Sequence, residues 1–392
     1  MQQPMRPERR NVVLVGAGHA HVTVLRAFGL NPLPRASLTL ISRGRHTPYS
    51  GMLPGLIAGD YRFEDIHIDT IPLTRFAGAR FHQDAAIGID LPNRQVICRG
   101  GDRVSYDVLS IDIGSTPNTA DVLGAAEHAI PVKPIDGFLS RCDALLARAL
   151  ARKGRTRLAV VGAGAGGVEL LLAVQQRLSL EISRAGFPAD RLAFVLVSAT
   201  GDILPAFPSA FRARLRALLA ERGIALVTGT RVGRVAPGRL VLDGGNAINA
   251  DEILWATQAA PPDWLAASGL PVDQSGFLIV DETLRVVGRD DVFAAGDIIS
   301  FAPRNLPKSG VYAVRAGPVL ADNLRRTLTN RPLQPFRPQR NALYLISTGN
   351  GRAIGTRNGL TFAGAWAWRW KDWLDRRFMR QFRDLPEKHG AA

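Results

Sequence analysis

The amino-acid sequence predicts an α/β protein with two similar domains, each built around a parallel β-sheet. A short apolar stretch, a glycine-rich turn and an amphipathic stretch follow one another in residues 11–28, and the same order recurs in residues 158–180. A second apolar stretch then follows each copy, at residues 37–42 and 192–198. Each copy therefore reads as a βαβ unit, which places its two strands in a parallel sheet with a right-handed crossover.

The length and composition are those of a globular protein. The chain has 392 residues, enough for two or three domains, of which 46% are hydrophobic and 21% charged. The formal net charge of +15 would suit nucleic acid. The sequence has, however, no long block of basic residues and no zinc-finger spacing. We attribute the charge to an arginine-rich composition and expect no nucleic-acid partner.

The two cysteines, Cys98 and Cys142, are far apart in the sequence. This spacing predicts neither a disulfide framework nor a metal site, and so few cysteines fit a reducing cytoplasm. The first ten residues lack the apolar segment of a signal peptide. The apolar run 158–174 contains several glycines and Glu169, so we interpret it as a strand, a turn and a helix and not as a membrane span. We therefore expect a cytoplasmic protein.

Further elements connect and follow the two units. Strands are expected at residues 86–90, 95–98 and 108–112, with turn residues between them. Residues 292–296 form a short apolar strand that ends at Asp297, and residues 313–328 have the spacing of an amphipathic helix. Several prolines from Pro332 onward predict a connector before a final C-terminal segment.

The second glycine-rich turn carries Gly162, Gly164 and Gly167 at its first, third and sixth positions. In a dinucleotide-binding turn, the first glycine permits the tight turn, the second admits the pyrophosphate, and the third lets the helix pack on the strand. The N-terminus of the following helix offers N–H groups and the positive end of its dipole to phosphate. A strand precedes this turn and a helix follows it, as the motif requires. The turn therefore predicts a dinucleotide site.

The first turn has Gly16 and Gly18, but His21 stands in place of the third glycine. Taken alone, it is equally well a βα turn without a ligand. The late sequence Gly296-Asp297 would put a carboxylate at the carboxyl edge of the sheet, where ligands bind, although such an aspartate can also cap a helix. Together with the second turn, these features favour a second nucleotide site.

Three sequence motifs carry a resemblance to a known family. They are G-A-G-H-A-H-V at residues 16–22, T-P-Y-S-G-M-L-P-G at residues 47–55 and P-K-S-G-V-Y-A-V-R at residues 307–315. With the two glycine turns and the late A-G-D, they resemble the FAD/NAD(P)-dependent oxidoreductases of the pyridine nucleotide-disulfide superfamily over roughly residues 11–330. Within it, the chain looks most like the oxidoreductase associated with selenophosphate synthetase, and it is similar to type II NADH dehydrogenase.

The resemblance implies two Rossmann-like nucleotide-binding domains of the three-layer ββα type, with the NAD(P) domain inserted into the FAD domain. The FAD domain would comprise residues 1–118 and 275–330, the NAD(P)H domain residues 119–274, and a C-terminal segment residues 331–392. Carried over position by position, the resemblance implies cofactor contacts at Gly16, Gly18, His19, Ser42, Arg43, Gly51, Pro54, Ala86, Gly114, Ser115, Gly162, Gly164, Gly167, Gly296, Asp297 and Gly310.

Two departures from the family pattern concern the ribose contacts. Ser42-Arg43 stands where an acid is expected after the second strand of the FAD domain, and Val197-Ser198 ends the corresponding strand of the insert. An acid at that place favours NAD and an arginine favours NADP. The choice between NADH and NADPH stays open, and so does the loss of nucleotide binding by the insert.

The residues support hydride transfer from NADH or NADPH to FAD and onward to a small-molecule acceptor, with quinone favoured. Disulfide reduction and cysteine-dependent sulfide oxidation need a pair of cysteines beside the flavin, and Cys98 and Cys142 are not such a pair. The cofactor carries the chemistry, so no catalytic triad is required. Two alternatives remain: a flavin-bound redox partner in selenium metabolism that binds selenophosphate synthetase, and an FAD-binding scaffold with a degenerate insert.

Two residues are candidates for catalysis. Lys308 would add positive charge beside the flavin, at the start of a helix near Ser309; the alternative is a solvated lysine in a loop. Glu169 directly follows the second turn, and the resemblance places this acid near the nicotinamide. The alternative is a first-turn glutamate that interacts with the helix dipole.

The C-terminal segment contains an amphipathic helix. Trp366, Trp370, Trp373, Leu374, Phe378 and Phe382 recur at helical spacing along one face, with basic residues, among them Lys371, largely off it. A basic helix with tryptophans on its apolar face can lie in a membrane interface, which would make the protein peripheral at the inner face of the membrane. The alternative is packing of residues 366–382 on the protein itself or on a dimer partner.

Overall fold

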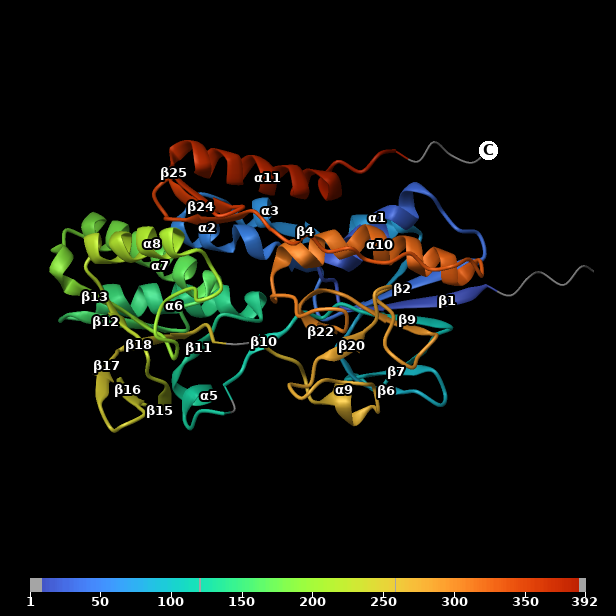
Figure 1. Cartoon of the computed structure of the whole chain (residues 1–392), viewed down its shortest axis with the longest axis horizontal. Helices are drawn as coiled ribbons and strands as arrows, with labels where there is room; N and C mark the ends of the chain where they lie inside the picture. The colour runs from blue at the N-terminus through green and yellow to red at the C-terminus, as the bar shows by residue number, and fades with distance from the viewer. Residues whose placement is uncertain (1–8, 120, 258, 388–392) are drawn as a thin grey trace, which may run out of the picture.

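The computed structural model describes residues 9–119, 121–257 and 259–387. The expected domain ranges 1–118 and 331–392 therefore extend at their outer ends into residues that lie outside the described part. Figure 1 shows two α/β bodies side by side, with the C-terminal helix lying above them. The mixed α/β fold with parallel sheets confirms the predicted fold class.

The first domain is built on a five-stranded parallel sheet. Its strands lie in the order β21 (Val292–Ala294), β9 (Val108–Ile111), β1 (Arg10–Val15), β2 (Ala36–Ser42) and β5 (Arg80–Gln83). Residues Val12–Val15 are all buried, because structure covers both faces of the sheet. This burial explains why the strand reads as a continuous apolar run.

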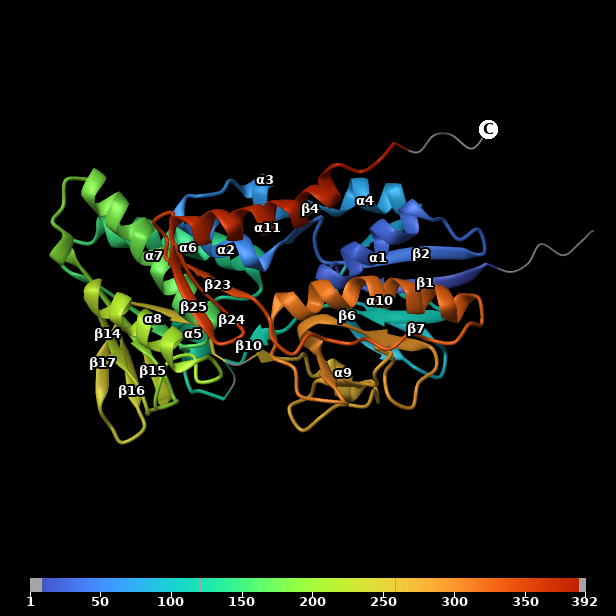
Figure 2. The ribbon, with the colours of Figure 1, turned by 45° about the horizontal axis from the view of Figure 1, so that its top comes forward.

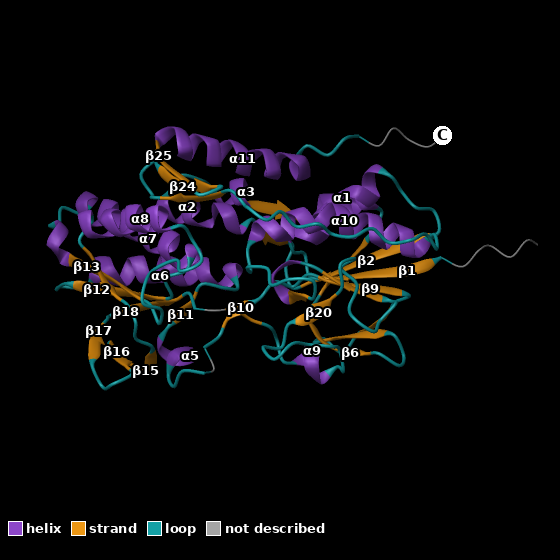
Figure 3. Ribbon diagram, viewed as in Figure 1, coloured by secondary structure: helices purple, strands orange, loops and turns teal. Residues whose placement is uncertain are grey.

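The two faces of this sheet are covered differently, as Figure 3 shows by secondary structure. Helices cover one face, and a small antiparallel sheet covers the other. The helices are α1 (His19–Leu30), α4 (Thr70–Ala77) and α10 (Gly310–Leu328); the small sheet is β6 (Ala86–Asp90), β7 (Gln95–Cys98) and β8 (Arg103–Ser105). Between β2 and β5 lie β3 (His46–Pro48), η1 (Ser50–Met52), α2 (Leu53–Ala58), α3 (Phe63–Ile66) and β4 (His67–Asp69).

The second domain repeats this plan. Its parallel sheet has the order β11 (Ile130–Pro131), β18 (Glu252–Trp255), β12 (Thr156–Val161), β13 (Leu192–Val197) and β14 (Ile224–Val227). Its helices are α5 (Ala125–His128), α6 (Ile135–Ala151), α7 (Ala165–Arg184), the short η2 (Ala189–Arg191) and α8 (Ser209–Glu221). A small antiparallel sheet comprises β15 (Val232–Ala236), β16 (Arg239–Leu242) and β17 (Ala247–Asn249).

The chain crosses between the two domains at one place. Strand β10 (Thr116–Pro117) pairs antiparallel with β19 (Ala259–Ala260), so the outgoing and returning segments lie side by side. After the return, the chain forms α9 (Trp264–Ala267), β20 (Leu278–Val280), η3 (Gly296–Ile298) and β22 (Ile299–Phe301). The expected strand 292–296 ends earlier, at Ala294, because Gly296, with a φ of +81°, begins the short helix η3.

The C-terminal segment spans both domains. Strands β23 (Tyr344–Ser347), β24 (Ala353–Arg357) and β25 (Leu360–Gly364) form an antiparallel sheet, and α11 (Ala365–Arg383) follows directly. In Figure 2, α11 extends from above the second domain to α3 and β4 of the first. Strand β23 contacts α7, while α11 contacts α3 and β4. This segment therefore covers the junction between the two glycine-rich turns.

Candidate active site

The second glycine-rich turn has the geometry that a dinucleotide needs. Gly162 has a φ of +112°, and a Cβ on Gly167 would lie 1.9 Å from the Gly162 carbonyl oxygen. The third glycine therefore lets α7 pack tightly on the turn. By contrast, a Cβ on Gly164, the N-cap of α7, would meet no described atom within 4 Å. The second glycine thus faces open space at the positive end of a helix dipole.

In the first turn, a carboxylate that the sequence analysis did not identify lies against the glycines. Asp112 is 2% exposed, and its Oδ2 accepts hydrogen bonds from the backbone N–H groups of Ala20 (2.8 Å) and His21 (3.1 Å). A Cβ on Gly18 would lie 2.3 Å from this carboxyl group, and one on Gly296 2.4 Å from it. Asp112 therefore joins α1 to the late Gly-Asp turn.

Burial sets the protonation of Asp112. It raises the pKa of this carboxyl to about 7, against the two N–H donors, which lower it. A sequence signal existed, because Asp112 is an acid between a short, mostly apolar strand and Gly114. Such an acid at the carboxyl edge of a parallel sheet is placed for function.

His21 replaces the third glycine of the first turn without opening the structure. Its ring is fully buried, with Nδ1 2.6 Å from the Gly16 carbonyl oxygen and Nε2 2.8 Å from Ser110 Oγ. Burial lowers the pKa of His21 to about 4, so the ring is neutral. A carbonyl can only accept, so Nδ1 carries the proton and Nε2 accepts from the Ser110 hydroxyl. The imidazole thus fills the space between helix and strand.

Two side chains beside the first turn retain unused hydrogen-bonding capacity. Within the described residues, His19 Nε2 and Ser115 Oγ are buried without a hydrogen-bond partner. A Cβ on Gly114 would meet no described atom within 4 Å. Because buried polar atoms are normally paired, these orphans indicate a missing polar ligand. The residues expected to contact FAD therefore fit a polar cofactor at this edge.

Asp297 lies at the carboxyl edge of the same sheet. Its Oδ2 is 2.8 Å from the ammonium group of Lys133, which comes from the second domain. A carboxylate here can accept hydrogen bonds from the hydroxyl groups of a ribityl chain. The pair also ties the two domains together at the site.

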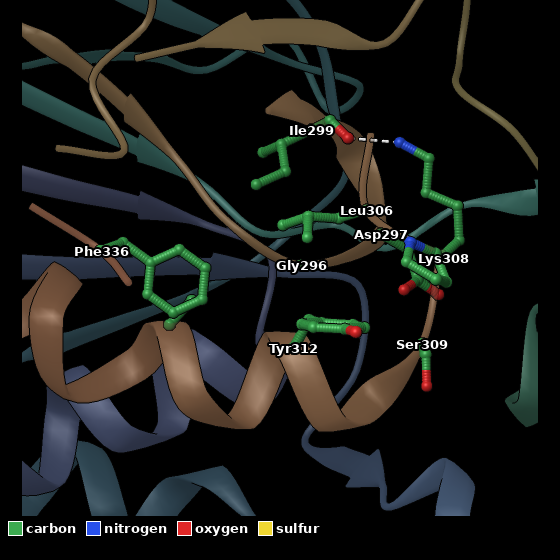
Figure 4. Close-up of a pocket in the computed structure, with 10 residues that line it drawn as sticks. Gly296, Asp297, Ile299, Leu306, Lys308, Ser309, Tyr312 and Phe336 are labelled. Carbon is green, nitrogen blue, oxygen red and sulfur yellow. Dashed lines mark hydrogen bonds between the residues drawn. The ribbon is translucent and has the colours of Figure 1, made fainter. Parts of the chain in front are cut away.

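The start of α10 lines a small pocket with Asp297 (Figure 4). Gly310 begins this helix, and a Cβ on it would lie 3.4 Å from Ser50 Oγ. The segment η1–α2, which contains Gly51 and Pro54, is therefore adjacent to the helix N-terminus. Lys308 points away from Ser309: its ammonium donates to the Ile299 carbonyl and lies 3.7 Å from the centre of the Phe277 ring. Burial lowers the pKa of Lys308.

The remaining candidates lie near the ends of β2 and β5. Ser42 ends β2, and its hydroxyl donates to the Gly44 carbonyl at 3.0 Å. Arg43 follows it, and Ala86 begins β6 directly after β5. The structure therefore gathers these candidates at the edge of the sheet remote from β21.

A buried charge cluster joins the two domains to the C-terminal helix; its members are Tyr49, Glu169, Lys371 and Asp375. The ammonium of Lys371 donates to the Gly51 carbonyl and lies 2.7 Å from Asp375 Oδ2. Asp375 also accepts from the Tyr49 hydroxyl. Glu169 Oε1 accepts from the backbone N–H of Ser347 at 2.7 Å.

The environment of Glu169 in this cluster lets its carboxyl group hold a proton near neutral pH. Burial raises the pKa of Glu169 to about 7, although Lys371 and the Ser347 N–H oppose this effect. Burial alone would lower the pKa of Lys371, but the charges of Asp375 and Glu169 outweigh it and raise that pKa. The cluster thus combines a fixed cation with an acid that can exchange its proton.

The expectation that Lys371 lies on the polar side of the C-terminal helix is wrong. Lys371 and Asp375 are 8% and 7% exposed, on the face that also buries Phe378 and Phe382. Each carries a charge that the other neutralises, which allows both to be buried. The outer face carries an exposed aromatic surface, defined here as Trp366 and Trp373, which are 50% and 48% exposed.

The loop after β13 holds charged groups near the expected ribose position of the insert. The carboxylate of Asp202 lies 2.7 Å from both Arg212 and Arg216. Sequence reasoning passed over them because none is adjacent to the strand end at Val197. The acid pairs with both arginines and offsets one of their two positive charges.

Within the described part of the chain, none of the helices is both long and apolar enough to cross a bilayer. Cys98 and Cys142 are both free and buried.

Comparison with known proteins shows which family of proteins this chain resembles. Residues 10–317 match the family model described as pyridine nucleotide-disulphide oxidoreductase. The chain is 26% identical to a type II NADH:quinone oxidoreductase of Haemophilus influenzae, across 91% of this chain and 90% of that protein. It is 24% identical to the type II NADH:quinone oxidoreductase of Staphylococcus aureus, with the same coverage.

Solved structures share the fold over nearly the whole chain. The sulfide:quinone oxidoreductase of Aquifex aeolicus has a TM-score of 0.79 at 19% identity, covering 96% of this chain and 92% of that one. NDH2 of Plasmodium falciparum, in complex with NADH, also has a TM-score of 0.79, at 15% identity, covering 97% and 99%. None of these names mentions selenophosphate synthetase, and that association stays a prediction.

Proposed function

The chain belongs to the pyridine nucleotide-disulphide oxidoreductase family, and on this premise we propose that it is an FAD-dependent NADH:quinone oxidoreductase that acts at a membrane surface. The relatives named above include NADH:quinone oxidoreductases that match this chain over nine-tenths of its length.

FAD belongs in the first domain. Gly16, Gly18 and the N-terminus of α1 would receive its pyrophosphate, and Asp297 would receive its ribityl hydroxyls. The unpartnered His19 Nε2 and Ser115 Oγ are the observations that support a polar ligand here. When bound, FAD supplies a hydride acceptor that passes electrons to a second substrate.

NADH belongs in the second domain. Gly164 faces open space at the N-terminus of α7, where the pyrophosphate of a dinucleotide would bind. The relatives named above support NADH over NADPH, because they are NADH:quinone oxidoreductases. The proximity of Glu169 to this turn supports a position for the nicotinamide end near the buried charge cluster.

The observation that carries the quinone proposal is the division of α11 into two functional faces. Its inner face reaches Gly51 through Lys371, and Gly51 lies in η1, which is expected to contact the flavin. Its outer face carries the exposed aromatic surface. Exposed tryptophans on a basic helix suit a lipid interface, where a lipid-soluble acceptor is found. One helix therefore connects the membrane surface with the site of electron transfer.

Reduction of a quinone to a quinol consumes two protons, and Glu169 is suited to supply one. Its pKa of about 7 lets it hold a proton near neutral pH and release it to an acceptor. Lys371 adds a fixed positive charge that stabilises negative charge developing on the acceptor oxygen.

The acceptor is tested by reducing the purified flavoprotein with NADH without oxygen and then mixing it rapidly with a short-chain benzoquinone. Cys98 and Cys142 are both free and buried, so they do not form a redox pair that could reduce a disulfide. The proposal therefore predicts fast reoxidation by the quinone and none by oxidised glutathione. Slow reoxidation by quinone together with fast reoxidation by the disulfide would overturn the assignment of the acceptor.

A further inference from the structure

A group of potential metal ligands lies in the first domain, outside the active site described above. His82 lies on β5, Asp84 follows that strand, and Cys98 ends β7. One ligand atom from each of the three lies within 4.8 Å of the others. A fourth donor is close, because Asp102 Oδ2 lies 3.5 Å from His82 Nε2. The four residues supply one nitrogen, one sulfur and two carboxylate donors.

The histidine nitrogen in this group lacks an ordinary partner. His82 Nε2 is buried, and within the described residues it makes no hydrogen bond. The Asp102 Oδ2 atom lies 3.5 Å from it. The side chain of His82 is only 13% exposed. Leaving such an atom unsatisfied destabilises the fold, so a ligand at this position would compensate. The second buried donor, Cys98, is 1% exposed.

The carboxylate of Asp84 is already held in place by the backbone. Its Oδ1 accepts from the N–H of Ala85 at 2.6 Å, and its Oδ2 accepts from the N–H of Gly100 at 2.9 Å. A carboxylate oxygen has two lone pairs, so each oxygen keeps one for a cation. Hydrogen bonds of this kind orient the ligands of metal sites.

The turn between β7 and β8 brings the remaining donors together. The N–H of Cys98 donates to the Asp102 carbonyl at 2.9 Å, which closes the turn. Gly101 has a φ of +97°, a conformation that favours glycine, and it lets the chain reverse within four residues. As a result, Asp102 returns to the side of the sheet edge where Cys98 and His82 lie.

We propose that His82, Asp84 and Cys98 bind one divalent cation of the zinc class, with Asp102 or water as the fourth ligand. Thiolate and imidazole donors select zinc or cobalt over calcium and magnesium, which prefer all-oxygen sites. Four donors of this kind suit the tetrahedral geometry of a structural zinc site. The cation would fasten the β7–β8 turn to the end of β5, at the entry to the segment that contains Ala86.

Cobalt provides a direct test, because a thiolate bound to Co²⁺ gives an intense charge-transfer absorption in the near ultraviolet. The full chain, freed of metal by dialysis against a chelator, is titrated with Co²⁺, and difference spectra cancel any flavin absorption. The chain has only two cysteines. Cys142 lies on α6 and is the matched control, so the absorption should appear in wild type and Cys142→Ser and be lost in Cys98→Ser and His82→Gln.

Thermal unfolding with Zn²⁺ gives a second readout that does not depend on flavin or activity. Zinc should raise the Tm of wild type and of Cys142→Ser, since a ligand that binds only the folded state stabilises it. It should leave the Tm of Cys98→Ser and His82→Gln unchanged, and unfolding without metal shows that these variants are folded. No charge-transfer absorption in wild type, or absorption that persists in Cys98→Ser, would overturn the site and leave the proposed NADH oxidation untouched.

Discussion

The Glu169 carboxylate accepts a 2.7 Å hydrogen bond from the backbone N–H of Ser347, a residue 178 positions further along the chain. This bond joins the second turn of α7, shortly after the second glycine motif, to the C-terminal sheet. Lys371 makes the corresponding connection to the first domain through the Gly51 carbonyl. The C-terminal segment therefore contacts both domains at the candidate site, and it is not an appendage to them.

Glu169→Gln tests the role of the proton. The amide oxygen can still accept from Ser347, but the group that titrates near pH 7 is lost. We expect reduction of the flavin by NADH to be preserved and reduction of quinone to fall by about a hundredfold, with its pH dependence near 7 removed. Rapid mixing separates the two half-reactions. Glu181→Gln, on the surface of the same helix, is the control and should match wild type in both.

Two glycines of the second turn separate cofactor binding from folding. In the structure described here, a Cβ on Gly164 meets no described atom within 4 Å, so Gly164→Ala should leave the Tm unchanged. If the pyrophosphate binds there, the variant should lose about tenfold or more in NADH affinity, equivalent to about 1.4 kcal/mol. Unchanged affinity for NADH in this variant would exclude this turn as the binding site of the dinucleotide.

Gly167→Ala should behave in the opposite manner. Its Cβ would lie 1.9 Å from the Gly162 carbonyl oxygen, so α7 would have to move away from the turn. We expect a loss of about 1–3 kcal/mol in stability, measured by denaturant unfolding. Wild-type stability in this variant would contradict the close packing of helix and turn.

Asp112→Asn tests the buried carboxyl through the pH dependence of stability. Because its pKa is raised from 3.8 to about 7, the folded state favours the protonated form. The resulting contribution is complete below pH 3.8 and is lost as pH rises through 7. Asparagine cannot ionise, so the variant does not share this loss. The Tm of the variant relative to that of wild type should therefore rise between pH 4 and pH 8. Asp190→Asn, at an exposed carboxylate, should show no such gain; a constant difference for Asp112→Asn would contradict the shifted pKa.

Replacing Trp366 and Trp373 together by alanine tests the exposed aromatic surface. Loss of these two side chains should weaken binding to vesicles of anionic lipid by at least about tenfold, measured by sedimentation. Oxidation of NADH by a water-soluble quinone should not change, because both tryptophans lie outside the buried charge cluster. Leu123→Ala removes an apolar residue that is 72% exposed in the second domain and serves as the control. Equal vesicle binding by all three proteins would exclude this surface as the membrane contact.

The sequence was sufficient for the fold because its signals are local. Buried parallel strands such as Val12–Val15 are continuous apolar runs, and the glycines of each turn lie within six residues. Both features can be read in a short window. The same holds for α11, whose aromatic spacing predicted a helix.

The missing parts of the site depend on contacts between distant segments. From the sequence alone, Lys371 resembles an ordinary surface lysine. Its burial follows only from the fold, which brings Gly51 and Asp375 beside it. Asp112 had a local signal, an acid after a buried strand, but its partners at Ala20 and Gly296 are supplied by the fold. The ligands proposed to bind zinc could not be predicted from cysteine spacing, because the chain has no closely spaced cysteines. They come together only when β6 pairs antiparallel with β7, which brings Cys98 beside Asp84.

The central claim is that NADH reduces a flavin held by this chain. An anaerobic titration of the purified protein with NADH, followed by flavin absorbance, tests it most directly. The account predicts rapid bleaching that is complete at one NADH per bound FAD, and slower bleaching by NADPH. A flavin that stays oxidised with both nucleotides would contradict the assignment of the second domain and of the function.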